Sequence, residues 1–358
     1  MKFPAGTMQV VQIVKRFGVV GGMEEYAFRL SIELPKLGFE VTVLCEKSFS
    51  SDSFPINVVE LGETIKPRWL SHYQFSQKAS KWLAAKPNNE RIVHSHERQS
   101  SHHVTTFHTT PFGYGRGPLF RFLSLRNFFY EQLERRELKG RDVQVIVPVS
   151  NRLGKMILRK HQGIKEKLSD AIYPAVSITN ENHTRNLVPP DGGTIGFIGK
   201  EWKRKGLPKV IQVWRDLKKI RPNLKLIVAG PHPAEVRFLF SSCEKDYDLL
   251  GYVDDKPKFF ESIDVLVHPA KLEAFGMVIT EALSFGVPVL CSSECGAAEI
   301  ISERYKSSAL SHQSKNEFWL NELESIFSNK KRMELYSRSW EQVAHEYLSL
   351  YESINGRI

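Results

Sequence analysis

The stretch from His268 to Glu281 places two carboxylates around the start of a predicted helix. A short apolar run at 264–267 precedes it and is typical of a buried parallel strand. Gly276 stands where strand gives way to helix, and the free amides of a helix start bind phosphate or sugar oxygens. Glu273 before the helix and Glu281 in its second turn are spaced to bind two separate hydroxyl groups. Two solvated glutamates on an ordinary strand–loop–helix unit are the alternative.

Two further loops are candidate anion sites. The segment 199–206, Gly-Lys-Glu-Trp-Lys-Arg-Lys-Gly, follows a predicted strand and carries four cations within six residues, which attracts an anion. Gly21 and Gly22 follow the first predicted strand and precede a helix, where glycines let a phosphate approach the backbone. The pattern Gly-x-Gly-x-x-Gly of nicotinamide sites is absent from that turn. A solvated basic loop and a plain turn are the respective alternatives.

Two patterns suggest a metal, but we expect none to be bound. Five histidines, at 94, 96, 102, 103 and 108, crowd a fifteen-residue window, and alternate residues of a strand point the same way. The triplet 246–248, Asp-Tyr-Asp, matches a pattern that holds divalent cations, but three-residue matches arise by chance. Polar strand ends and a polar loop are the alternatives.

The chain alternates strand-like and helix-like stretches in two series, which is the pattern of two doubly wound parallel sheets. Residues 176–193 lack periodicity and contain adjacent prolines and glycines, so we interpret them as a linker. The predicted Rossmann-like domains are therefore 1–175 and 194–339. In such sheets, ligands bind outside the carboxyl ends of the strands.

Composition and charge favour a globular protein with an anionic partner. The 358 residues are 41% apolar and 25% charged. Residues 1–185 contain 27 basic and 17 acidic residues, whereas the remainder contains 23 of each, so the whole net charge of +10 arises in the first half. The four cysteines form no Cys-x-x-Cys pair, and we find no signal peptide and no apolar run long enough to span a bilayer. We expect a cytoplasmic protein.

The segment 112–160 interleaves arginines and lysines with aromatic residues. Such a surface suits an anionic membrane, and it would also suit nucleic acid. Because no known nucleic-acid module is present, we expect no nucleic-acid partner and predict peripheral association with the inner face of the cytoplasmic membrane. The alternative is that the aromatic side chains belong to the core and the arginines are solvated.

Three motifs occur together: His268-Pro269, the turn Glu-Ala-Phe-Gly at 273–276, and Glu-Ala-Leu-x-x-Gly-x-Pro-Val at 281–289. This composite resembles the donor-sugar signature of the family-4 retaining glycosyltransferases. That resemblance, which extends from about residue 21 to 299, implies the α/β GT-B fold, with two Rossmann-like domains facing across a cleft. It also implies that the last helix, within 340–358, crosses back to pack on the first domain.

The resemblance implies roles for residues of the second domain. Glu281 would bind the ribose hydroxyls, and Val253 would lie near the base. Glu273 and four backbone amides would hold the donor hexose and the diphosphate. These amides belong to Ala274, Phe275, Gly276 and Met277.

It also implies roles for residues that face the donor from elsewhere. His108, in the motif Phe-His-Thr, would hydrogen-bond the sugar, and Lys205 would neutralise the departing diphosphate. Lys200 stands where relatives usually carry arginine, and the loop of Gly21 and Gly22 would face the diphosphate. The predicted catalytic set is therefore His108, Lys205 and Glu273, with Glu273 in a sugar-binding role.

The predicted function is that of a retaining hexosyltransferase in lipopolysaccharide-core or surface polysaccharide synthesis. A UDP-linked sugar is the expected donor, and a GDP- or ADP-sugar is the alternative. A glycan or lipid-linked acceptor is the expected partner, and the resemblance implies that no metal or other cofactor takes part. A nucleotide-sugar epimerase or hydrolase, or a nucleotide-sugar-binding protein without transfer activity, remains as an alternative of a different class.

Overall fold

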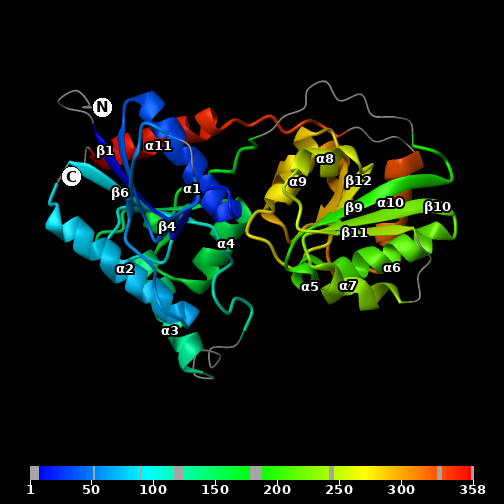
Figure 1. Cartoon of the computed structure of the whole chain (residues 1–358), viewed down its shortest axis with the longest axis horizontal. Coiled ribbons are helices and arrows are strands. Elements are labelled where there is room, and N and C mark those ends of the chain that lie inside the picture. The colour runs from blue at the N-terminus through cyan, green and yellow to red at the C-terminus, as the bar shows by residue number, and fades with distance from the viewer. Residues whose placement is uncertain are drawn as a thin grey trace. The chain divides into compact units, whose positions relative to one another are not determined.

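The computed structural model describes residues 8–50, 53–88, 90–116, 124–177, 188–241, 246–328 and 333–355 (Figure 1). The chain divides into two compact units. Unit 1 is Met1–Pro174 together with Arg338–Ile358, and unit 2 is Ala175–Ser337. Most of the predicted linker, 178–187, lies outside the described residues. Each unit is an α/β unit built on one six-stranded parallel sheet, so the predicted fold class of two Rossmann-like domains is confirmed.

The sheet of unit 1 has the strand order β5-β3-β1-β6-β7-β8, and every neighbouring pair is parallel. Its strands are β1 (Gln9–Ile13), β3 (Glu40–Cys45), β5 (Asn57–Glu60), β6 (Arg91–Ser95), β7 (Val104–Phe107) and β8 (Val145–Pro148). A small second sheet pairs β2 (Arg16–Phe17) with β4 (Lys47–Ser48). The strand order reverses between β1 and β6, which is where open α/β sheets bind ligands.

The helices of unit 1 come from both ends of the chain. They are α1 (Gly22–Glu33), η1 (Leu34–Leu37), α2 (Arg68–Ala85), α3 (Leu125–Lys139), α4 (Asn151–Lys160), η3 (Lys165–Lys167) and the C-terminal α11 (Trp340–Asn355). Helix α11 packs on α1, where the ring of Tyr26 lies edge-on to Trp340 and Tyr347. The last helix of the chain therefore belongs to the first unit.

Unit 2 repeats the same strand order, β11-β10-β9-β12-β13-β14, with parallel neighbours throughout. Its strands are β9 (Gly192–Ile198), β10 (Asn223–Ala229), β11 (Tyr247–Gly251), β12 (Val265–His268), β13 (Val289–Ser292) and β14 (Ala309–Leu310). The strand order reverses between β9 and β12. The two candidate anion segments, 199–206 and 268–281, directly follow these two strands and therefore meet at the switch point.

The helices of unit 2 cover a core whose large aromatic side chains include Trp214, Trp319 and Phe240, all buried. They are α5 (Trp202–Lys205), α6 (Leu207–Lys218), α7 (Pro233–Val236), η4 (Arg237–Phe240), α8 (Lys256–Glu261), α9 (Met277–Ser284), η5 (Gly296–Ile300), η6 (Glu303–Ser308) and α10 (Asn316–Ser328). Burial of each such aromatic side chain contributes roughly 1.5–3 kcal/mol. This packed core is the rigid support for the loops at the carboxyl edge.

Candidate active site

Two glycines allow close contacts of the loop after β9, one within that loop and one with the loop after β12. Gly199 has φ +155°, and a Cβ built there would lie 2.2 Å from Cδ of Lys205, so the lysine stem lies across the bare backbone. Gly206 has φ +87°, and a Cβ there would lie 2.4 Å from the carbonyl oxygen of Pro269. A larger residue at Gly206 would push the two loops apart, and one at Gly199 would displace the Lys205 side chain. The glycines therefore set the position of Lys205.

The same two loops are also joined by hydrogen bonds. The amide of Lys271 donates to the carbonyl of Arg204 at 2.9 Å, and the Arg204 guanidinium donates to the carbonyl of Leu272 at 2.6 Å. These bonds fix the base of the loop that carries Glu273.

Glu273 is a largely buried carboxylate with three basic neighbours. Its Oε1 lies near Nζ of Lys205 (3.3 Å), the guanidinium of Arg204 (3.3 Å) and Nε2 of His268 (3.7 Å). Burial alone would raise its pKa, but His268, Lys205 and Arg204 together hold that pKa well below its usual range. Oε1 nevertheless accepts no hydrogen bond within the part of the chain that the structure describes. The carboxylate is ionised and has capacity for a hydroxyl donor.

Helix α9 begins without a side-chain cap. Its N-cap is Gly276, in the left-handed conformation (φ +101°), and its first turn holds no acidic residue. The turn before it is anchored because the amide of Ala297 donates to the carbonyl of Phe275 at 2.8 Å. The start of α9 thus presents the positive end of the helix dipole, with no carboxylate in its own first turn to neutralise it. Together with Lys205 it forms a site suited to a phosphate.

Glu281 lies on the second turn of α9 and has one free oxygen. Its Oε1 accepts a hydrogen bond from Nζ of Lys256 at 2.7 Å, whereas Oε2 is buried and has no partner among the described residues. Sequence reasoning did not identify Lys256, although it begins α8 only three residues after Val253. Val253 itself is half-buried and lies two residues beyond the end of β11.

The other predicted residues of unit 2 differ in exposure. Phe275 and Ala274 are buried, Met277 is half-buried, and Lys200 is exposed. In the Asp-Tyr-Asp triplet, Asp246 forms an ion pair with Lys218 at 2.6 Å. Within the described ranges, no group of three or more histidine, cysteine, aspartate or glutamate side chains is arranged to hold a metal ion.

In unit 1, His108 follows β7 and is half-buried. Its Nε2 lies 2.9 Å from Nδ1 of His96, and the ring of Tyr26 packs edge-on to it with 4.9 Å between the centroids. Burial lowers the pKa of His108 to about 3, so the imidazole is neutral at physiological pH. The histidine-rich window thus contains a hydrogen-bonded pair at this strand end.

Gly21 and Gly22 form the start of α1, but acidic side chains already lie there. A Cβ built on Gly21 would lie 2.5 Å from Oε2 of Glu24, so that carboxylate lies against the glycine. Glu24 also forms an ion pair with Arg16. A diphosphate bound at this turn would therefore meet the Glu24 carboxylate.

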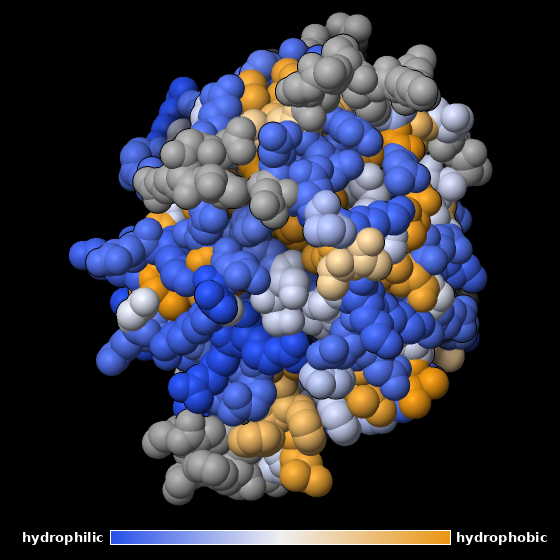
Figure 2. Space-filling model, turned by 90° about the vertical axis from the view of Figure 1, so that its left-hand side faces the viewer, coloured by the Kyte–Doolittle hydropathy of each residue, from blue (hydrophilic) through white to orange (hydrophobic). Residues whose placement is uncertain are grey.

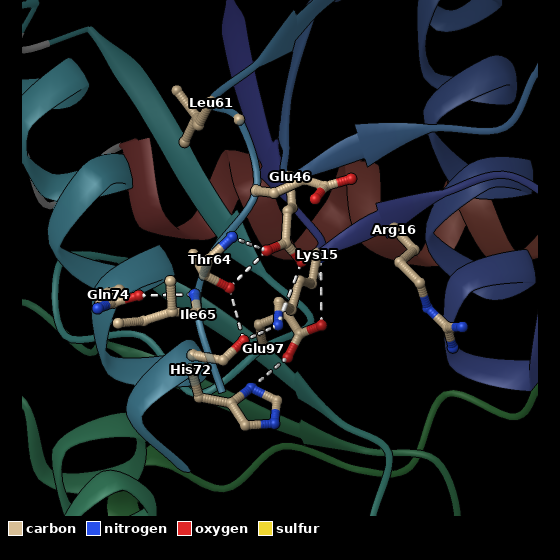
Figure 3. Close-up of polar contacts among 12 residues, drawn as sticks. Lys15, Arg16, Glu46, Leu61, Thr64, Ile65, His72, Gln74 and Glu97 are labelled. Carbon is tan, nitrogen blue, oxygen red and sulfur yellow. Dashed lines mark hydrogen bonds and ion pairs between the residues drawn. The ribbon is translucent and has the colours of Figure 1, made fainter. Parts of the chain in front are cut away.

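A polar cluster at the carboxyl edge of unit 1 was missed by sequence reasoning. Figure 3 shows Lys15, Glu46 and Thr64 pointing toward one another, and Glu97 and His72 lie beside them. Nζ of Lys15 lies 3.2 Å from Oε2 of Glu46, and Oε1 of Glu46 accepts from the Thr64 amide at 2.5 Å. The Glu97 carboxylate accepts from the Lys15 amide at 3.2 Å and lies 3.4 Å from Nδ1 of His72. The only available signal was a polar residue shortly after each of β1, β3 and β6.

Both halves of the chain match known protein families. Residues 20–180 match the family described as Glycosyltransferase Family 4, and residues 179–342 match the family described as Glycosyl transferases group 1. The lipopolysaccharide glucosyltransferase WaaG of Escherichia coli is 30% identical over 110 residues, which cover 30% of this chain and 29% of that protein. The matches span between 29% and 57% of the length of these curated relatives.

Solved structures show the same fold over nearly the whole chain. The structure of WaaG, a glycosyltransferase involved in lipopolysaccharide biosynthesis, has 17% identity and a TM-score of 0.76, and the match covers 98% of this chain and 99% of that one. The structure of Anabaena Alr3699/HepE in complex with UDP and glucose has 16% identity and a TM-score of 0.63, with 98% of each chain covered. The chain therefore belongs to the glycosyltransferases that combine a family 4 domain with a group 1 domain in the GT-B fold.

Proposed function

We propose that this chain transfers a hexose from a UDP-sugar to a glycan or lipid-linked acceptor, with retention at the anomeric carbon, in lipopolysaccharide-core or surface polysaccharide synthesis. The relative WaaG is a lipopolysaccharide glucosyltransferase, which supports the acceptor class. The structure of the Anabaena protein holds UDP and glucose, which supports the donor class.

One observation carries this proposal: the uncapped start of α9 follows Glu273, which pairs with Lys205, and Glu281 on the second turn of α9 has a buried oxygen without a partner among the described residues. A cation and helix amides match a diphosphate, and a buried carboxylate oxygen without a partner matches a ribose hydroxyl. The loop of Gly21 and Gly22 keeps its predicted place near the diphosphate only if Glu24 swings away from Gly21. Lys200 and Val253 keep their predicted donor-binding roles.

The proposed reaction takes place on one face of the sugar. The acceptor oxygen forms a bond to the anomeric carbon as the bond to the diphosphate breaks, and the acceptor proton passes to the departing phosphate oxygen. Lys205 and the start of α9 stabilise the charge that develops on that phosphate, so we propose that no metal is needed. Glu273 binds sugar hydroxyls, because a carboxylate with a strongly lowered pKa is a poor nucleophile. His108 hydrogen-bonds the donor sugar.

The test is a thermal-shift measurement with UDP, GDP and ADP, each with and without EDTA. We expect a large shift with UDP that EDTA leaves unchanged and that Glu281→Ala abolishes. Glu303→Ala is the matched control, because Glu303 is exposed and lies in η6, away from α9. If no nucleotide shifts the melting temperature of the wild type, the proposal is wrong. If the shift requires a metal, the metal-free part of the proposal is wrong.

We further propose that α3 contacts an anionic membrane surface on the cytoplasmic side. Leu125, Phe128 and Phe129 lie three and four residues apart on this helix and are all exposed, Leu125 at 77%. Figure 2 shows a face of the molecule that is mainly hydrophilic, with its hydrophobic residues in small groups. No helix among the residues described has both the length and the apolar character needed to cross a bilayer. Peripheral binding would combine these side chains with the exposed cations Arg126 and Arg135 of the same helix.

Flotation with vesicles that contain anionic lipid, at low salt, tests this contact. The wild type should float with the vesicles, and Phe128→Ser should reduce the bound fraction. Phe318→Ser, at a similarly exposed phenylalanine of unit 2, should bind like the wild type. Equal binding of all three proteins, or no binding of the wild type, would exclude α3 as the membrane contact.

A further inference from the structure

A continuous chain of buried polar side chains leads from His108 into the interior of unit 1. Nδ1 of His96 lies 2.9 Å from Nε2 of His108, and Nε2 of His96 lies 2.8 Å from Oε1 of Gln12. The amide nitrogen of Gln12 lies 3.3 Å from Nδ1 of His94 and donates to the hydroxyl of Tyr351. Gln12, His94, His96 and Tyr351 are all buried, so each must find its partners within the protein.

The chain continues from His94 to a backbone carbonyl. Nε2 of His94 lies 2.7 Å from Oγ1 of Thr106, which in turn hydrogen-bonds the hydroxyl of Tyr347 at 2.5 Å. Tyr26 donates to the hydroxyl of Tyr347 at 3.1 Å, and its oxygen lies 3.5 Å from the carbonyl oxygen of Ile172.

The contacts at this end orient the Gln12 amide. Its nitrogen faces His94 and donates to the hydroxyl of Tyr351, which lies 2.6 Å from Nδ1 of His94. The amide oxygen of Gln12 is therefore directed to the other side, toward His96.

The same logic reaches His108 through the other end of the Gln12 amide. Its oxygen accepts from Nε2–H of His96, which leaves a lone pair on Nδ1 of His96. Burial, with the neighbouring His94 and His108, lowers the pKa of His96 well below its usual value, so this ring is neutral. His108 must then donate its Nε2–H to His96, and its own Nδ1 carries a lone pair.

We propose that Gln12 and His96 are positioning residues that hold His108 in its Nε2–H tautomer, so that Nδ1 accepts a hydrogen bond from a hydroxyl of the donor sugar. This inference rests on the proposed function of His108. An imidazole lone pair attracts a hydroxyl hydrogen and repels a carboxylate oxygen. The tautomer therefore selects a neutral hexose over a hexuronic acid as the transferred sugar.

Nitrogen NMR of protein labelled with 15N-histidine measures the tautomer directly, and the His108 signals are assigned by their loss in His108→Gln. In the wild type we expect a protonated Nε2 and an unprotonated, pyridine-type Nδ1. Gln12→Met removes the amide that orients His96 and should release His108 to a mixture of tautomers. Gln99→Met is the matched control: Gln99 is also buried in unit 1, its amide has no partner among the residues described, and it should leave the His108 signals unchanged.

Kinetics with UDP-glucose and UDP-glucuronate provide the second readout. Gln12→Met should reduce the preference for UDP-glucose at least roughly tenfold, the effect of exchanging a good polar contact for a poor one at a binding site. A pyrrole-type, protonated Nδ1 in the wild type would overturn the inference, even if transfer occurs and even if Gln12→Met fails to fold. Absence of transfer by the wild type would refute the proposed function, and the nitrogen spectrum would still decide the tautomer.

Discussion

Two buried glutamates, one in each unit, have the same kinds of basic neighbour but different contact geometry. Glu134 in unit 1 and Glu273 in unit 2 are each surrounded by an arginine, a lysine and a histidine. Both oxygens of Glu134 accept hydrogen bonds, whereas the nearest basic nitrogens lie 3.3 to 3.7 Å from Glu273 and its Oε1 accepts none among the residues described. The same set of charges thus forms a closed cluster in one unit and an open one in the other.

The closed cluster joins separate segments of unit 1. Glu134, on α3, contacts Nζ of Lys160 at 2.6 Å, Nε2 of His161 at 2.7 Å and the guanidinium of Arg98 at 3.2 Å. It also accepts from the amide of Phe112 at 2.7 Å. Such a cluster positions loops and leaves no donor for a ligand. The open cluster around Glu273 leaves its Oε1 available, as a binding site requires.

This comparison also shows that net charge alone does not locate the candidate phosphate site. The excess of basic residues is in the first half of the sequence, yet the candidate phosphate site lies in unit 2. In unit 1, glutamates pair with the basic residues at the carboxyl edge, as Glu46 does with Lys15 and Glu24 with Arg16. The number of charges in a segment therefore says less about ligand binding than whether those charges are paired.

The largest expected effect is on stability. Glu134→Gln should lower the free energy of unfolding by roughly 3–5 kcal/mol, because it leaves buried basic groups without their counter-ion. Glu273→Gln should cost less, because the Arg204 side chain is 38% exposed and stays solvated when the carboxylate is neutralised. Urea unfolding of both variants measures the difference. Equal losses of unfolding free energy would show that the two clusters stabilise the fold equally, and would contradict the difference between them.

The next largest effect is on transfer. Lys205→Ala should lower kcat roughly 10²–10³-fold, the usual cost of removing one group that stabilises transition-state charge. Lys160→Ala is the matched control, because it removes the lysine of the closed cluster; it should weaken folding and leave kcat of the folded protein unchanged. Initial rates with saturating donor measure both. A kcat loss in Lys160→Ala as large as that in Lys205→Ala would contradict the assignment.

The local part of the candidate site was predictable from sequence, and the long-range part was not. Lys205, Glu273 and the start of α9 lie in two short segments that directly follow strands, so strand prediction alone placed them at one edge. Lys256 and Glu134 escaped notice because their partners lie 22 to 36 residues away in the chain.

The histidine window shows the same limit more sharply. Its spacing left a metal site and polar strand ends as alternatives, because sequence cannot show which side chains meet. The structure joins His94 to Tyr351, which is 257 residues later and on the last helix. No pattern within 94–108 indicates that partner, so the hydrogen-bonded chain could not have been inferred before α11 was placed.

The pH dependence of stability should separate two neighbouring glutamates of α3. Burial alone would raise the pKa of Glu134, but His161, Arg98 and Lys160 lower it to about 2, so its stabilising effect is present above about pH 4.5 and is lost as pH falls toward 2. Burial raises the pKa of Glu137 to about 8; Glu134 and Glu97 add to this increase, and Arg98 and Thr105 oppose it. Glu137 therefore destabilises the fold as pH rises from 4.5 through 8.

Urea midpoints between pH 3 and pH 9 test these opposite signs. The gap between wild type and Glu134→Gln should narrow below pH 4.5. Glu137→Gln should gain stability relative to the wild type as pH rises, with the largest gain near pH 9. If both variants show the same pH dependence, the two carboxyls do not differ in ionisation. The assignment of Glu134 as the ionised carboxylate of the closed cluster would then be wrong.

The smallest expected effect concerns the exposed rim of the open cluster. Lys200 is exposed and follows β9 directly after Gly199, at a position where the family resemblance implies arginine. A guanidinium binds a phosphate through two parallel hydrogen bonds, so Lys200→Arg should tighten donor binding, by roughly 1 kcal/mol or about fivefold in KM, with kcat unchanged. Lys15→Arg, at the paired edge of unit 1, should leave KM for the donor unchanged because Glu46 already holds that cation. A fall in KM for Lys15→Arg as large as that for Lys200→Arg would mean that both edges, and not the open one alone, bind the diphosphate.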